Sequence, residues 1–294
     1  MMSRTLESIL LEIEAEMGLM HLGFALSPND QAILDQPHLA SKYRILKLEE
    51  DLPVSVKNEL FRIANSPLYS RHKGQKVEDF WEVAQALGME NIKAFIFSSA
   101  LFGIAPANRD IQALKDRCLA TTGLSLAIMH NVLGFDLSIG PKVQLCALVS
   151  EFGKIPFFLY KDKMVSDESV QGILTDDFIN IHHGQFGLKM INLFDLPDFL
   201  SHLFDKNSLI FFDQAHHIAM TTIVRIAKLM VRDSFKRTGK LIITSVVDDP
   251  YQVIHGSVGT ELQGFFDSLG ISHLLEIIPF ELPAQEYARK KTKK

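Results

Sequence analysis

The sequence has few of the residues that mark a secreted or a nucleic-acid-binding protein. Its 294 residues include only two cysteines, Cys118 and Cys146, and both stand in apolar, helical sequence. Two such cysteines do not make a disulfide framework, so we expect a reducing, cytoplasmic compartment. Only 22 % of the residues are charged and the net charge is −5, whereas proteins that bind DNA or RNA through its phosphates usually carry a basic excess. We therefore expect no nucleic-acid partner.

Long hydrophobic runs are missing as well. The apolar stretches are interrupted well short of the roughly 18–20 residues that a membrane-spanning helix needs. Four glutamates divide the apolar positions near the N-terminus and so exclude the continuous hydrophobic region of a signal peptide: Glu7, Glu12, Glu14 and Glu16. The sequence therefore predicts no membrane partner.

The usual catalytic signatures are also missing. We find no glycine-rich phosphate loop, no serine elbow, no paired-cysteine zinc motif and no HExxH. Residues 82–93 do have the spacing of a helix-turn-helix, with Gly88 in the turn, but the second helix carries one cation, Lys93, beside Glu90. A helix that reads a DNA groove presents donors to base edges, so a packed helical hairpin is the favoured interpretation.

What the sequence does have is helical periodicity over nearly its whole length. Hydrophobic residues make up 47 % of the chain, enough for a full core. Apolar residues at three-and-four spacing predict helices at about 6–20, 39–48, 52–65, 77–87, 90–102, 110–133, 143–152, 178–194 and 212–235. Residues 143–152 are apolar nearly all round, which predicts a central, buried helix. The expected fold class is all-α.

One stretch, residues 241–247 (LIITSVV), is rich in β-branched residues. No second run of that kind offers it a partner, and a lone strand would leave its backbone groups unpaired. We therefore favour a fold without strands that ends in short helices near 251–269 and 274–278. The basic tail, residues 289–294, is expected to be a solvated chain end.

Residues 59–70 (ELFRIANSPLYS), followed about twenty residues later by 83–88 (VAQALG), resemble the HDOD domain, a bacterial, all-helical relative of the HD-type metal-dependent phosphohydrolases. Residues 145–155 (LCALVSEFGKI) are similar to the segment in which HD enzymes carry a His-Asp pair. His183–Gly187, with Leu196-Pro197 further on, resembles the next segment of that family. The resemblance covers about residues 35–235.

The resemblance implies a two-lobed helical bundle like that of HD domains. Residues 1–108 would form the N-terminal helical lobe of the HDOD module. Residues 109–238 would form the HD-like bundle with the degenerate metal site, and residues 239–294 a C-terminal helical extension with the basic tail.

The departures from the HD pattern bear on activity. By the resemblance, the metal-binding His-Asp pair falls on Ser150 and Glu151, and serine is a neutral, weak ligand. Other expected histidines fall on Cys118, Asn207 and Ser208, so that only His183 keeps its type. A catalytic metal site normally has about three protein ligands. The resemblance thus implies a vestigial site with no catalytic residue, no metal and no cofactor. The alternative is a rebuilt site that uses Glu151, His183, Cys118 and either Asp176 or Asp177.

For function, the resemblance implies a non-enzymatic signal-transduction module that regulates an unknown signalling protein by direct contact. The candidate contact surface surrounds the first motif: Arg62, Asn65, Ser66, Tyr69, Arg71 and Lys73. One alternative is a divergent metal-dependent phosphohydrolase acting on a nucleotide. Another is a sensor of a small ligand, such as a cyclic dinucleotide, in the cleft between the lobes, where Arg62, Arg71, His72 and Lys73 would attract phosphate.

Overall fold

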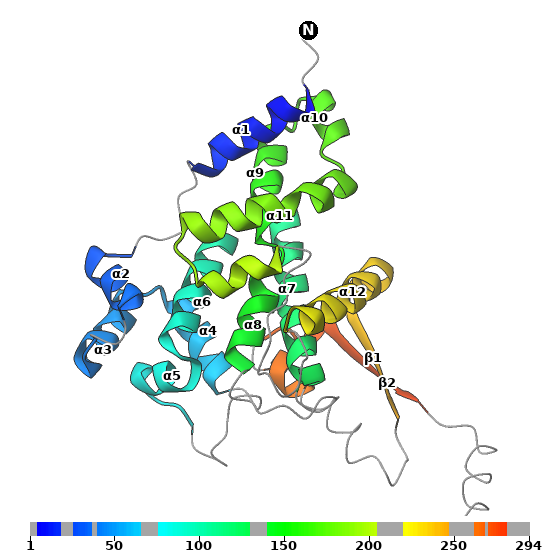
Figure 1. The fold of residues 1–294 in the computed structure, drawn as a ribbon. Coiled ribbons are helices and arrows are strands. Elements are labelled where there is room, and N and C mark those ends of the chain that lie inside the picture. The colour runs from blue at the N-terminus through cyan, green and yellow to red at the C-terminus, as the bar shows by residue number, and fades with distance from the viewer. Residues whose placement is uncertain are drawn as a thin grey trace, which may run out of the picture.

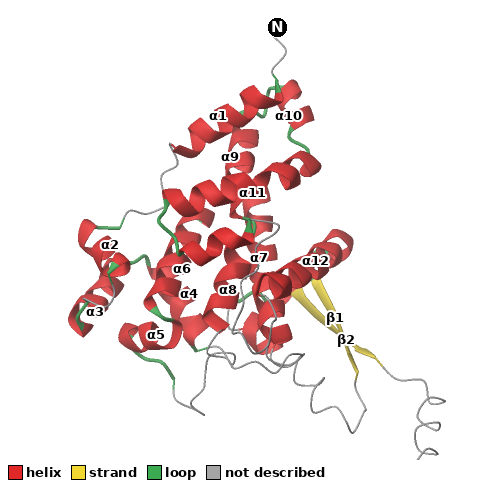
Figure 2. Ribbon diagram, viewed as in Figure 1, coloured by secondary structure: helices red, strands yellow, loops and turns green. Residues whose placement is uncertain are grey.

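The computed structural model describes residues 5–18, 26–36, 40–65, 76–129, 140–204, 220–246, 262–267 and 270–280. Almost all of these residues are helical, so the predicted all-α class is confirmed (Figure 2). The predicted boundaries near residues 108 and 238 are not tested by this architecture and stay predictions.

The described residues up to 102 form six helices: α1 (Leu6–Gly18), α2 (Pro28–Asp35), α3 (Lys42–Asp51), α4 (Val54–Ala64), α5 (Phe80–Leu87) and α6 (Met89–Phe102). Side-chain caps start three of them, because Ser27, Ser41 and Asp79 accept hydrogen bonds from backbone N–H groups of the first turn. Gly88 has φ +81° between α5 and α6, as expected for the turn. On α6, Lys93 is buried and its Nζ lies 2.8 Å from Asp195 Oδ2, so it is not presented to a DNA groove.

The described residues from 109 to 238 form α7 (Arg109–Ala127), α8 (Gly140–Val149), η4 (Phe152–Lys154), α9 (Ile155–Lys163), α10 (Glu168–Ile173), α11 (Asp176–Leu193), η5 (Asp198–Leu203) and α12 (Met220–Thr238). The helix α8 is the buried central one that the sequence predicts, and it packs against α6, α7 and α12 (Figure 1). Its side chains from Val143 to Val149 lie in the core.

One expectation about hydrophobic runs was wrong. Residues 142–163 form a 22-residue helical stretch that is long and apolar enough to cross a membrane by length and composition. However, 89 % of its most apolar window is buried inside the protein, as in the core helix of a soluble protein. The stretch also breaks between α8 and α9, where Ser150 and Glu151 stand.

The expectation of a fold without strands was also wrong. Strand β1 (Leu241–Val246) pairs in parallel with β2 (Leu275–Phe280), and Leu241 lies opposite Leu275. The sequence had predicted a short helix over residues 274–278, but Ser272–Leu274 is a single 3₁₀ turn, η6, and the strand follows it. Residues 262–267 are helical, whereas 251–261 and the basic tail lie outside the described residues.

Candidate functional site

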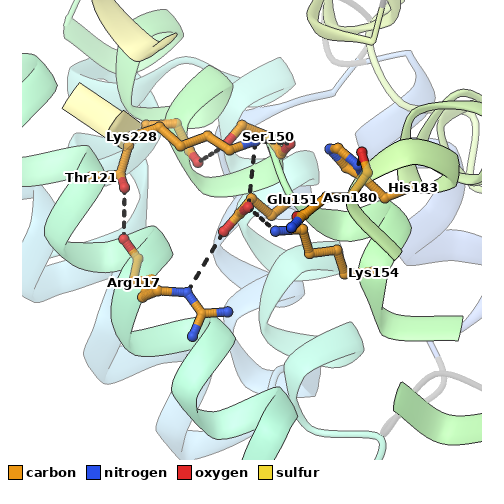
Figure 3. Close-up of polar contacts among 9 residues, drawn as sticks. Arg117, Thr121, Ser150, Glu151, Lys154, Asn180, His183 and Lys228 are labelled. Atoms are coloured by element: carbon orange, nitrogen blue, oxygen red, sulfur yellow. Dashed lines mark hydrogen bonds and ion pairs between the residues drawn. The ribbon is translucent and has the colours of Figure 1, made fainter. Parts of the chain in front are cut away.

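The candidate site lies at the C-terminal end of α8, where the buried helix stops and Glu151 follows. The Glu151 side chain is only 8 % exposed, and three cations from three elements point at its carboxylate (Figure 3). Lys154 of η4 hydrogen-bonds Oε1, Lys228 of α12 places Nζ 3.4 Å from Oε1, and Arg117 of α7 places Nε 3.9 Å from Oε2. We call these four residues the Glu151 cluster.

Close packing of η4 against α11 brings His183 next to the Glu151 cluster. A Cβ atom added at Gly153 would lie 1.8 Å from the backbone oxygen of His183 and 2.5 Å from the backbone nitrogen of Gly187. Only a glycine therefore lets the two backbones approach so closely. The turn after α8 thus carries Ser150 and Glu151 directly past the α11 turn that holds His183.

Electrostatics make this site positive. Burial by itself would raise the pKa of Glu151, but Lys228, Lys154 and Arg117 outweigh it and lower that pKa to about 2. The carboxylate is therefore ionised at neutral pH. Burial lowers the pKa of Lys154, although the neighbouring Glu151 opposes the shift. One negative charge thus faces three positive ones.

His183 is neutral in this surrounding. Burial first, and then the charges of Lys228 and Lys154, lower its pKa to about 4. The Nδ1 atom lies 2.9 Å from the backbone oxygen of Asn180. Because a carbonyl oxygen only accepts hydrogen bonds, Nδ1 carries the proton and Nε2 is left with its lone pair.

The structure brings together four of the six residues predicted as a vestigial site. Ser150 and Glu151 are adjacent to His183, and the charge of Glu151 acts on the thiol of Cys118. Burial, together with Glu151, raises the pKa of Cys118 to about 12, so the thiol stays protonated. Asn207 and Ser208 lie outside the described residues.

Sequence reasoning missed the three cations of the Glu151 cluster. Lys154 lies three residues after Glu151 within the HD-like segment, so its place could have been found from the spacing. Arg117 and Lys228 come from other helices, and no local pattern links them to Glu151. Their roles depend on how α7, α8 and α12 pack.

Two cavities flank Lys228. The first, of about 380 Å³, lies between the end of α8, α11, η5 and α12, and we call it the His183 cavity. The second, of about 580 Å³, lies between α7, the start of α11 and the C-terminal half of α12, and we call it the Asp176 cavity. Both volumes fall within the range of small-molecule sites.

Comparison with known proteins identifies the family. The model of the HDOD domain family matches residues 32–208, which is more than half of the chain and includes the motif at 59–70. The chain belongs to the HDOD domain family. The resemblance drawn from the sequence is thereby confirmed over residues 32–208, whereas its predicted continuation to about residue 235 stays a prediction.

Solved structures with the same architecture include a proposed metal-dependent phosphohydrolase from Shewanella amazonensis. It is 14 % identical, with 90 % of this chain and 97 % of that one covered at a TM-score of 0.59. An HDOD domain protein of unknown function from Geobacter sulfurreducens is 15 % identical, with 92 % and 94 % covered at a TM-score of 0.47. The first likeness confirms the HD-like fold. No curated protein matches the chain.

The HD-like fold raises the question of whether this HDOD chain can hold a divalent metal, and its residues do not suit one. Both oxygens of Glu151 already face cations of the chain, and Cys118 is buried. Asp176 and Asp177 are exposed in the first turn of α11. Within the described ranges, no group of three His, Cys, Asp or Glu residues has the arrangement of a metal site.

The predicted contact surface of the HDOD motif is described only in part. Asn65 uses its side chain within the protein: its Nδ2 donates to Phe61 O and Val77 O, and its Oδ1 accepts from Val77 N at 2.7 Å. It thereby ties the end of α4 to the segment before α5, while Arg62 is exposed. Ser66, Tyr69, Arg71, His72 and Lys73 lie outside the described residues.

Acidification is expected to lower the free energy of unfolding of this chain. As the pH falls below 6.5, His183 takes up a proton in the unfolded chain, but it does so only near pH 4 in the folded one. Glu151 acts in the same direction below pH 4.5, because its folded pKa is about 2. Stability is therefore greatest above pH 6.5 and falls progressively towards pH 4, as urea unfolding at several pH values would measure.

Two adjacent histidines of α11, His182 and His183, provide the variant and its control for this pH dependence. His183→Gln should flatten the loss of stability between pH 7 and pH 5, whereas His182→Gln, which removes a ring that stacks on Phe178 at 4.5 Å, should keep it. Equal pH dependence in both variants would contradict the assignment to His183.

Proposed function

We propose that this HDOD chain is a non-enzymatic, cytoplasmic regulatory module that acts by contact with a signalling protein. The observation that supports the proposal most is the Glu151 cluster. At the position where HD enzymes carry a metal-binding acid, this chain holds a carboxylate that three of its own cations neutralise. The cluster ties α7, η4 and α12 together, and its role in the proposal is structural.

Within the Glu151 cluster, the position of Lys228 bears most directly on catalysis. Its ammonium lies 3.4 Å from Glu151 Oε1 and 3.5 Å from the backbone oxygen of Ser150. Hydrolysis in HD enzymes relies on a metal that lowers the pKa of a bound water. An ammonium supplies a positive charge to the same acid but has no coordination site for such a water. The proposed chain therefore keeps the fold and lacks the means to activate a nucleophile.

Metal analysis and a phosphodiesterase assay test this proposal together. We expect the purified full chain to hold far less than one equivalent of metal, and to hydrolyse bis-p-nitrophenyl phosphate no faster than buffer with Mn²⁺, Mg²⁺ or Fe²⁺. Ser150→Ala should behave identically, because the Ser150 hydroxyl donates only to Ala147 O, at 2.9 Å within its own turn. Stoichiometric metal, with turnover that disappears in His183→Ala, would overturn the proposal.

A further inference from the structure

The first helix of the chain, α1, lies outside the HDOD match but rests on the matched domain. The family model begins at residue 32, whereas α1 ends at Gly18. The helix nevertheless packs across α9, at one end of the bundle (Figure 1). Both α9 and α11 lie within the match and bind α1 through Tyr160, Lys163 and Lys189, which we call the α9–α11 surface. The family domain thus carries a helix-binding surface that a segment from outside it covers.

One side of α1 is apolar and buried. Ile9, Ile13 and Met17 follow one another at four-residue spacing, and none of them is more than 6 % exposed. This is the spacing at which an amphipathic helix places its anchors in a hydrophobic groove. On the other side of the helix, Leu11 is 67 % exposed and Ala15 is exposed too. The contact is therefore of the helix-in-groove kind.

On one flank of the buried stripe, two glutamates of α1 meet α9. The hydroxyl of Tyr160 donates a hydrogen bond to Glu12, and Lys163 pairs with Glu16. Tyr160 is buried, whereas the ion pair stays accessible to water, with 54 % of the lysine side chain exposed. The α9 side of the contact thus combines one buried polar anchor with one exposed charge pair.

The other flank of the stripe meets α11. Lys189 pairs with Glu14, and both side chains are partly exposed. Because successive residues lie about 100° apart around a helix, Glu14 falls on the opposite side of the stripe from Glu12 and Glu16. The sequence of α1 contains four glutamates and no lysine or arginine. An acidic helix therefore lies between lysines on both flanks, and the charges of the two surfaces are complementary.

This contact is built so that it can open without unfolding the core. The helix has 13 residues, and isolated helices shorter than about 12–15 residues are marginal in water. Its helical form therefore depends largely on docking. The two ion pairs are exposed, and such pairs add little to stability and weaken with salt. A terminal segment of this kind opens locally at a lower free energy than the buried helices.

We propose that the α9–α11 surface is the docking site for an acidic amphipathic helix of the partner protein, and that α1 occupies it as an intramolecular competitor. The inference rests on the proposed function, since it specifies how the signalling protein is bound. The partner helix carries apolar residues at positions i, i+4 and i+8 and carboxylates at i+3, i+5 and i+7, as α1 does from Ile9 to Met17. Because α1 is tethered, it competes at a high effective concentration, and the partner binds where α1 is displaced.

Fluorescence anisotropy with a labelled peptide of residues 5–18 tests the proposal on the full chain. The matched variants are Ile13→Asp, which places a charge in the buried stripe, and Leu11→Asp, which places the same charge on the exposed side of α1. We expect the Ile13→Asp chain to stay folded by circular dichroism and to bind the peptide at least tenfold more tightly than the Leu11→Asp chain. Equal affinity in the two variants would overturn the proposal. So would an Ile13→Asp chain that does not fold, because α1 would then belong to the cooperative core.

A charge exchange locates the binding surface. In the Ile13→Asp chain, Lys163→Glu together with Lys189→Glu should weaken peptide binding roughly tenfold, because two attractive pairs become repulsive and each exposed pair changes affinity by only a few-fold. A peptide that carries Glu14→Lys and Glu16→Lys should recover this loss on the same variant. Binding that ignores both exchanges would place the peptide elsewhere and contradict the proposal.

Hydrogen exchange and size-exclusion chromatography of the unmodified chain complete the test. We expect a monomer in which the amides of α1 exchange well before those of α8. A dimer that exchanges α1 between two copies would make a second chain the occupant and overturn the proposal. Failure of the peptide to bind the Ile13→Asp chain would overturn this inference and leave the proposed function standing, because the metal and phosphodiesterase measurements decide that function separately.

Discussion

Gly153→Ala is expected to prevent the chain from folding, or to lower its free energy of unfolding by more than about 4 kcal/mol, which few single substitutions do. The added Cβ would lie 1.8 Å from His183 O and 2.5 Å from Gly187 N. Both are backbone atoms of α11, so no side-chain rotation relieves the overlap. The two elements would have to separate, although η4 and α11 pack together along several residues.

Gly172→Ala is the matched control for Gly153→Ala. Gly172 lies within α10, and no atom stands within 4 Å of a Cβ placed there. Alanine favours a helix over glycine by roughly 0.5–1 kcal/mol, so this variant should unfold at the same or higher urea concentration. Yield of folded protein, circular dichroism and urea unfolding measure both variants. A Gly153→Ala chain as stable as the unmodified one would show that η4 and α11 are not held as closely as described.

The contact between η4 and α11 brings the residues of the site together. The sequence could predict the parts of the site that depend on local patterns, but not those that depend on tertiary contacts such as this one. Burial of α8 follows from an apolar pattern that is complete within residues 143–152, and the site residues next to it were found through the HD-like segment. By contrast, nothing local to Glu151 indicates Arg117 or Lys228. They meet Glu151 because α7 and α12 pack on α8, and such contacts depend on the tertiary arrangement.

The paired strands were missed for a related reason. Glu276 and Pro279 interrupt the run of β-branched residues in β2, so it does not resemble a buried strand. Parallel pairing also needs no tight turn between the strands, which removes the hairpin signal that antiparallel pairs give. The position of Pro279 is tolerated because a two-stranded sheet has only edge strands.

Glu151→Gln is the second change with a large expected effect, a loss of about 3–5 kcal/mol in the free energy of unfolding. Glutamine keeps the shape of the side chain and removes its charge. Lys154 is buried and would be left beside Lys228 and Arg117 without a negative partner. Glu276→Gln, which removes the partner of an exposed pair with Lys240 at 3.7 Å, should change stability by less than about 1 kcal/mol.

A double-mutant cycle separates the charge effect from loss of packing. Lys154→Met alone should lower stability less than Glu151→Gln, because Lys228 and Arg117 still neutralise the acid. Added to Glu151→Gln, Lys154→Met should restore part of the lost stability, since it removes an unpaired buried charge while keeping an apolar chain of similar length. Strictly additive losses in urea unfolding would contradict the view that three cations and one acid act as a unit. A restored midpoint would instead show that Glu151 is held in place chiefly to neutralise the cations that surround it.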